Sequence, residues 1–115
     1  MTLVVKQGVD QAIEIPDVQV NGVTFQPVGY SAFAMARTLT RDPLVLAEWT
    51  TVTPTPPGKL PITLSVGLVS LALPAVVTAT WTWRHAKFQV ELVDGLGRVA
   101  RIADERVSVS PETTY

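Results

Sequence analysis

The chain has 115 residues, a formal net charge of −1 and no cysteine. This length predicts one domain, and a composition that is 47% hydrophobic and 17% charged excludes a disordered chain. The near-neutral charge argues against nucleic acid or an anionic membrane as a partner, and the absence of cysteine excludes disulfides and cysteine-ligated zinc. With no export signal in its first residues, we expect the chain to be made in a reducing cytoplasm.

Alternation of apolar and polar residues recurs along the chain, whereas a helical period does not. Such a pattern is typical of half-buried strands. Runs of this kind lie at residues 2–6, 12–15, 18–20, 23–25, 30–37, 44–52, 62–66, 68–73, 78–83, 88–92, 98–103 and 106–110. With nine prolines and seven glycines between them, they predict an all-β fold. We expect an antiparallel β-sandwich of about seven to nine short strands with Greek-key or meander connections.

Turn signals separate several of these runs. Asn21-Gly22 favours a type I′ turn and predicts a hairpin over residues 18–25. The loop at Asp94–Gly97 predicts a second hairpin, and Asp104-Glu105 predicts a further turn before the last run. Residues 53–58 contain three prolines and are expected to form a loop. The chain therefore reads as a series of short strands joined by tight turns.

The run at residues 30–37 has an unusual composition. Phe33 and Met35 would lie on one face of a strand, and Ala32, Ala34 and Ala36 on the other. A large face opposite a small face suits a strand between two layers, although the alanines also permit a helix.

The stretch from Lys59 to Arg84 carries no charge between its ends, for about two dozen residues, which is long enough for a membrane-spanning helix. It also contains Pro61, Gly67, Pro74 and many threonines and serines, which suit strands and turns better than a lipid-facing helix. We therefore expect no membrane partner.

Residues that carry chemistry are scarce. His85 is the single histidine, and no cluster of histidines or carboxylates has the spacing of a metal site. Asp94–Gly97 lacks the third glycine and the following helix of a phosphate-binding loop. No motif marks an activated serine with a base. We predict no enzymatic activity, no catalytic residue, no metal and no cofactor.

The three tryptophans could form a ligand surface. Trp81 and Trp83 are two residues apart and would share one face of a strand, and Trp49 lies on another predicted strand. Such a face is either core or a binding platform, and burial of aromatic rings favours core. A glycan-binding module therefore stays as the alternative function.

Four segments carry a resemblance to a known family in their order and spacing: residues 27–37, 44–48, 88–102 and 107–114. They resemble the small β-sandwich modules of tailed-bacteriophage virions. The similarity is to the N-terminal domain of siphophage baseplate upper proteins and to small free-standing relatives in actinobacteriophages. The proline-rich middle, residues 53–83, departs from the pattern.

The resemblance implies a virion structural protein without an active site, present in many copies on the capsid surface or in the tail or baseplate. Its partners would be copies of itself and major capsid, tail or baseplate subunits, with a host glycan only in the alternative. We expect one domain over residues 1–115, with residues 1–16 as an N-terminal arm and 111–115 as a tail. The candidate interface or ligand residues are Val4, Ile13, Ile15, Trp49, Trp81 and Trp83.

Overall fold

The computed structural model describes residues 2–110, with the side chain of Thr2 excepted; residues 1 and 111–115, and with them the predicted C-terminal tail, lie outside this range. The described elements are, in chain order, β1 (Thr2–Lys6), β2 (Gln11–Ile15), β3 (Gln19–Val20), β4 (Val23–Thr24), β5 (Ser31–Arg37), β6 (Val45–Thr50), β7 (Leu60–Ser65), β8 (Leu68–Leu73), α1 (Ala75–Thr78), β9 (His85–Val93) and β10 (Val99–Ser110).

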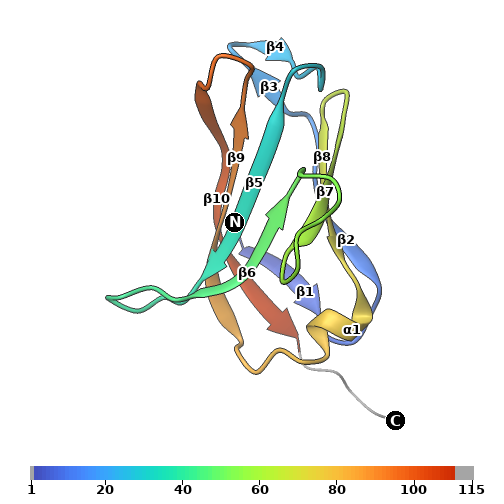
Figure 1. Ribbon diagram of the computed structural model, residues 1–115. Coiled ribbons are helices and arrows are strands. Elements are labelled where there is room, and N and C mark those ends of the chain that lie inside the picture. Colours follow the sequence, from blue (N-terminus) through green and yellow to red (C-terminus); the bar gives the residue numbers. More distant parts are fainter. Residues whose placement is uncertain (1, 111–115) are drawn as a thin grey trace.

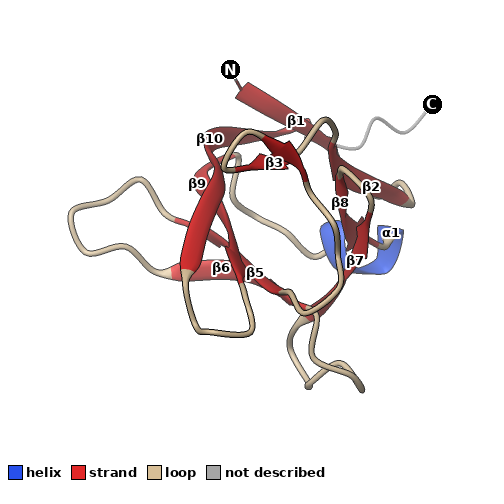
Figure 2. Ribbon diagram, turned by 90° about the horizontal axis from the view of Figure 1, so that it is seen from above, coloured by secondary structure: helices blue, strands red, loops and turns tan. Residues whose placement is uncertain are grey.

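Eight strands form one sheet in the order β1-β10-β9-β5-β6-β7-β8-β2. The sheet curls around a central interior, so that β1 and β2, at its two ends, come round toward each other as in a nearly closed barrel (Figures 1 and 2). The predicted all-β class is confirmed. The expected antiparallel pairing holds for most of the sheet, but β1 pairs with β10 in parallel, and so does β6 with β7.

Two short elements lie at the ends of this barrel (Figure 1). At one end the β3–β4 hairpin turns through Asn21 and Gly22, which both have a positive φ, as the predicted type I′ turn requires. Phe25 follows the hairpin, is buried, and packs edge-to-face against Tyr30 with ring centroids 5.1 Å apart. At the other end α1 precedes the loop that carries Trp81.

Side chains from all around the sheet fill the interior. Trp49 and Phe88 meet edge-to-face with ring centroids 5.6 Å apart, and both are buried. The strand β5 faces this interior with Ala32, Ala34 and Ala36, all of which are fully buried. Small residues fit there because the large rings of neighbouring strands already occupy the space. The large residues of β5 consequently point away from the core.

The structure corrects three predictions about local elements. The run at residues 78–83 forms no strand, since Thr78 ends α1 and a loop follows. Asp104-Glu105 forms no turn, because β10 continues through it with a register shift between Arg101 and Ala103. The described part of the arm predicted at residues 1–16 is not separate from the domain, because it contains β1 and β2, which pair within the sheet.

The uncharged stretch predicted to be sheet rather than membrane helix forms β7, β8 and α1. Pro74 ends β8, and Gly67 adopts a positive φ in the tight turn between the two strands. Within residues 2–110, no helix is long and apolar enough to cross a membrane.

Candidate functional site

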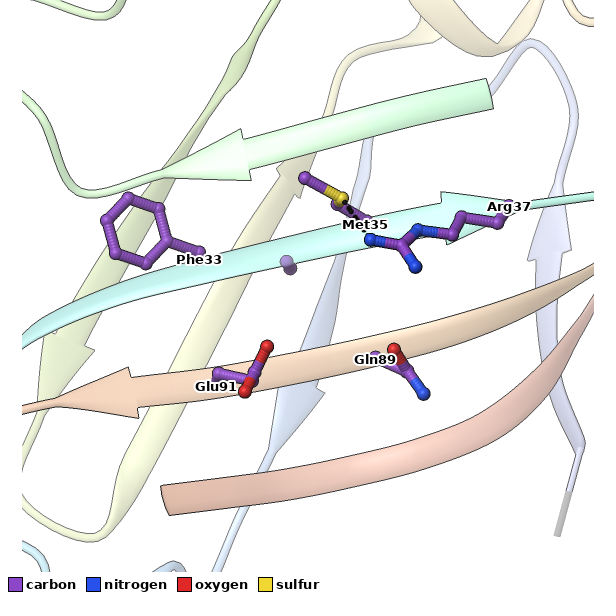
Figure 3. Close-up of a pocket in the computed structure, with 6 residues that line it drawn as sticks. Phe33, Met35, Arg37, Gln89 and Glu91 are labelled. Carbon is purple, nitrogen blue, oxygen red and sulfur yellow. Dashed lines mark hydrogen bonds between the residues drawn. The ribbon is translucent and has the colours of Figure 1, made fainter. Parts of the chain in front are cut away.

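The outer face of β5 and β9 carries a shallow hollow (Figure 3), which we call the outer hollow. It has a volume of about 70 Å³ and is lined by Phe33, Ala34, Met35, Arg37, Gln89 and Glu91. Phe33 keeps 43% of its surface exposed although it sits in the middle of an internal strand. The alternation in the sequence predicts that Phe33 and Met35 share one face of the strand, but it does not indicate that this face points outward.

The register of the two strands sets which side chains of the outer hollow are neighbours. Phe33 lies directly opposite Glu91, and Met35 directly opposite Gln89. The guanidinium of Arg37 folds back along β5, and its Nη2 lies 3.1 Å from the Met35 sulfur (Figure 3). Within the described range, the Glu91 carboxylate has no ion-pair partner. The outer hollow thus joins two apolar side chains to a guanidinium and a carboxylate.

Three cations continue from one end of this hollow across the sheet. Arg37 lies opposite Lys87 in the β5–β9 pair, and Lys87 lies opposite Arg106 in the β9–β10 pair. All three side chains are exposed and share the outer face. We call them the basic row. Like charges directly opposite each other on neighbouring strands destabilise a sheet, so this arrangement is unfavourable for the isolated domain.

Few carboxylates compensate the basic row. Asp104 lies 3.6 Å from the Lys87 ammonium, but its other oxygen lies 3.7 Å from Arg101, so that one carboxylate serves two cations. In the described part of the chain, no carboxylate lies within ion-pair distance of Arg37 or Arg106. His85, two residues before Lys87 on β9, is exposed opposite Ser108. Within residues 2–110, this end of the outer face therefore carries two cations, Arg37 and Arg106, without an ion-pair partner.

A larger cleft opens on the side of the barrel between β6 and β7. These strands pair only through Trp49 with Leu60 and Thr50 with Pro61, which leaves residues 45–48 of β6 without a β7 partner on this side. The cleft has a volume of about 280 Å³ and is lined by Leu46, Ala47, Glu48, Gly58, Lys59, Leu60, Val77 and Trp81. The Lys59–Glu48 ion pair, at 3.4 Å, lies at its rim.

Of the three tryptophans predicted as a ligand surface, Trp81 lines this cleft, and the three do not share one face. Trp49 is only 2% exposed, and its indole Nε1 donates to the carbonyl oxygen of Ala72 at 2.9 Å, so it belongs to the core. Trp81 is 9% exposed and packs against Trp83 with ring centroids 4.6 Å apart. The pair sits in a loop rather than on a strand, and it does not form the exposed platform that a glycan-binding module would need.

The three N-terminal candidates divide between core and surface. Ile13 is buried, and Ile15 is partly buried and packs against the core. Val4 is 64% exposed on the outer side of β1. Of the three, Val4 is therefore the residue available for contact with another protein.

Both ends of the sheet leave a strand edge open. β1 pairs only with β10, and β2 pairs only with β8, among the described strands. The side chain of Gln11 links the two ends at one point, because its Oε1 accepts from the Lys6 amide and its Nε2 donates to the Lys6 carbonyl. Beyond this link, no strand within residues 2–110 pairs with the outer edges of β1 and β2.

Potential catalytic groups are dispersed. Within residues 2–110, no three His, Cys, Asp or Glu side chains are grouped to hold a metal ion. Asp94 sits in the turn between β9 and β10, where hydrogen bonds from the Arg98 amide and the Arg98 side chain lower the pKa of its carboxyl. These bonds fix the turn, and they give the carboxylate a structural role.

Comparison with known proteins adds no relative. The sequence matches no protein-family model, and a search of curated proteins finds no match. The resemblance to virion modules therefore rests on the sequence segments alone.

Proposed function

We propose that this chain is a non-catalytic structural subunit of a bacteriophage virion, which assembles with copies of itself and with capsid, tail or baseplate subunits. The observation that carries the assembly role is the pair of open strand edges, β1 and β2, in an otherwise continuous sheet. Exposed edges are templates for pairing with another chain, and natural proteins cover them or protect them. The virion setting is supported by the order of the resembling segments.

Exposed apolar side chains support the same proposal. Val4 on β1, Leu44 beside β6 and Leu96 in the β9–β10 turn are each more than half exposed. A domain of this size that assembles with neighbours can bury such side chains at its interfaces, since these resemble a protein core in packing.

The experiment that tests the proposal is gold-labelled antibody microscopy of purified particles from the phage that encodes the chain. We expect label on every particle, at regular positions. A Val4→Lys phage variant should lose label, because lysine on an exposed edge strand opposes pairing. Ser70→Lys is the matched control, since Ser70 lies on β8 with Glu14 of β2 on one side and Thr63 of β7 on the other. Unlabelled wild-type particles would refute the virion role.

A further inference from the structure

We propose that the basic row, together with the adjoining outer hollow, binds an extended acidic segment of a partner protein. This inference deepens the proposed function, on which it rests, by naming the chemistry of one partner. The row places Arg37, Lys87 and Arg106 side by side on three adjacent strands. Its cost to the sheet, and the lack of a carboxylate for two of its members within residues 2–110, are both relieved when a partner supplies negative charge.

The spacing of the row suits the carboxylates of an extended chain. Neighbouring strands lie about 4.8 Å apart, so the three side chains start within a span of about 10 Å. Carboxylates at alternate positions of an extended segment are about 7 Å apart. Two of them can therefore reach the three cations, and the two guanidinium groups can each take a carboxylate in a bidentate fashion.

The outer hollow supplies the apolar half of the same surface. Arg37 belongs to both features, and it lies on the same strand face as Phe33 and Met35. An apolar side chain that follows the acidic residues would cover Phe33, which is 43% exposed. The partner segment we infer thus carries acidic residues next to an apolar one.

The surroundings of the row favour an acidic peptide over a nucleic acid. Asp104, opposite Gln89, lies two residues along the sheet from the row on the same face, Glu91 lies four residues along in the same direction, and the whole chain carries a net charge of −1. A continuous polyanion that ran past the row in this direction would meet both carboxylates, whereas a short acidic segment confined to the row would not. The observations therefore favour a local patch of negative charge.

Fluorescence anisotropy with synthetic probes tests this inference on the full chain. The probes are a labelled peptide in which Glu alternates with Leu, the same peptide with Gln in place of Glu, and a labelled oligothymidylate. We expect the Glu peptide to bind and the Gln peptide to bind at least about tenfold more weakly, with affinity falling as salt is added. Equal binding of both peptides, binding of oligothymidylate alone, or no binding of any probe would each overturn the inference.

Substitutions test whether the Glu peptide binds at the basic row. Arg37→Gln and Arg106→Gln should each weaken the Glu peptide several-fold, and the double variant should abolish its binding. Arg41→Gln removes the same charge from an exposed position in the loop between β5 and β6, and it should leave binding unchanged. Because the row is unfavourable in the free domain, the two row variants should unfold at the same or a higher temperature than the parent. An equal loss of peptide binding in Arg41→Gln would show that the peptide does not bind at the basic row.

These outcomes are separable from the virion test. If the peptide binds but particles carry no label, the acidic partner lies outside a virion and the proposed function fails. If particles are labelled but the peptide does not bind, the assembly role stands and the basic row is not its contact.

Discussion

The indole nitrogen of Trp49 on β6 donates a hydrogen bond to the main-chain oxygen of Ala72 on β8, at 2.9 Å. The bond crosses the interior past β7, which lies between these strands in the sheet. It joins the two walls at the place where β6 and β7 pair through only two residues each. Trp49 thereby holds the side of the barrel together from within.

Replacing Trp49 by phenylalanine should destabilise the domain. The change removes the donor and leaves the partly buried Ala72 carbonyl without this hydrogen bond, which costs about 1–3 kcal/mol before any cavity is counted. Trp83→Phe is the control, because the buried Nε1 of Trp83 has no hydrogen-bond partner in the described chain. Urea unfolding should show the larger loss for Trp49→Phe. An equal loss in both variants would show that the bond to Ala72 does not contribute.

A second prediction comes from β5, which faces the core with its alanines and solvent with its large side chains. Ala34 is buried against the core, so Ala34→Leu should overpack it and lower the free energy of unfolding by about 1–3 kcal/mol. Its neighbour Phe33 lies on the outer face, and Phe33→Thr should change the stability by less than about 0.5 kcal/mol. Denaturant titrations of the two variants measure this contrast. A greater loss for Phe33→Thr would mean that β5 faces the core with its large side chains.

Acid should weaken the β9–β10 turn through Asp94. Hydrogen bonds from Arg98 hold the pKa of this carboxyl below its ordinary value of 3.8. A carboxyl with a lowered pKa in the folded state contributes its full stabilisation above its unfolded pKa and loses it as the pH falls through the folded pKa. Asp94→Asn should therefore melt at a lower temperature than the parent at neutral pH. The gap should close well below pH 3.8, and a gap that stays constant with pH would contradict this role.

The Gln11 side chain is expected to control fraying at the junction of β1 and β2. Gln11→Ala removes the acceptor of the Lys6 amide and the donor to the Lys6 carbonyl, which should cost about 0.5–1.5 kcal/mol per bond. Hydrogen exchange read by NMR should show faster exchange at Lys6. Gln19→Ala, at an exposed position of β3, should leave that amide unchanged. Unaltered exchange in Gln11→Ala would show that the strands are held by other contacts.

Local patterns predicted the local parts of this fold. The hairpins around Asn21-Gly22 and Asp94–Gly97 and the strands on both sides of Gly67 are confirmed, because alternation and turn residues act over a few neighbours. The parallel pairs were missed, since strand pairing outside a tight hairpin leaves no short-range signal, even between consecutive strands such as β6 and β7. Residues 78–83 alternate like a strand, but Thr78 ends α1 and the following residues form a loop at one end of the barrel.

The candidate site was harder to predict from the sequence than the local elements. The alternation in β5 showed two unlike faces, but which face pointed inward depended on the rings of Trp49 and Phe88 from other strands. The basic row was hidden for the same reason. Arg37, Lys87 and Arg106 are far apart along the chain, and only the register of β5, β9 and β10 aligns them.

The parallel pairing of β1 with β10 bears on how the polypeptide reaches its native state in the cell. Residues 2–6 are translated before residues 106–110, which are their partners in the sheet. Val5 is buried in the finished domain, so its side chain must wait until these partners have been translated. Such distant pairing has a high contact order and slows folding. We therefore expect the domain to complete its sheet only after synthesis has passed β10, with the waiting segment exposed to chaperones in the meantime.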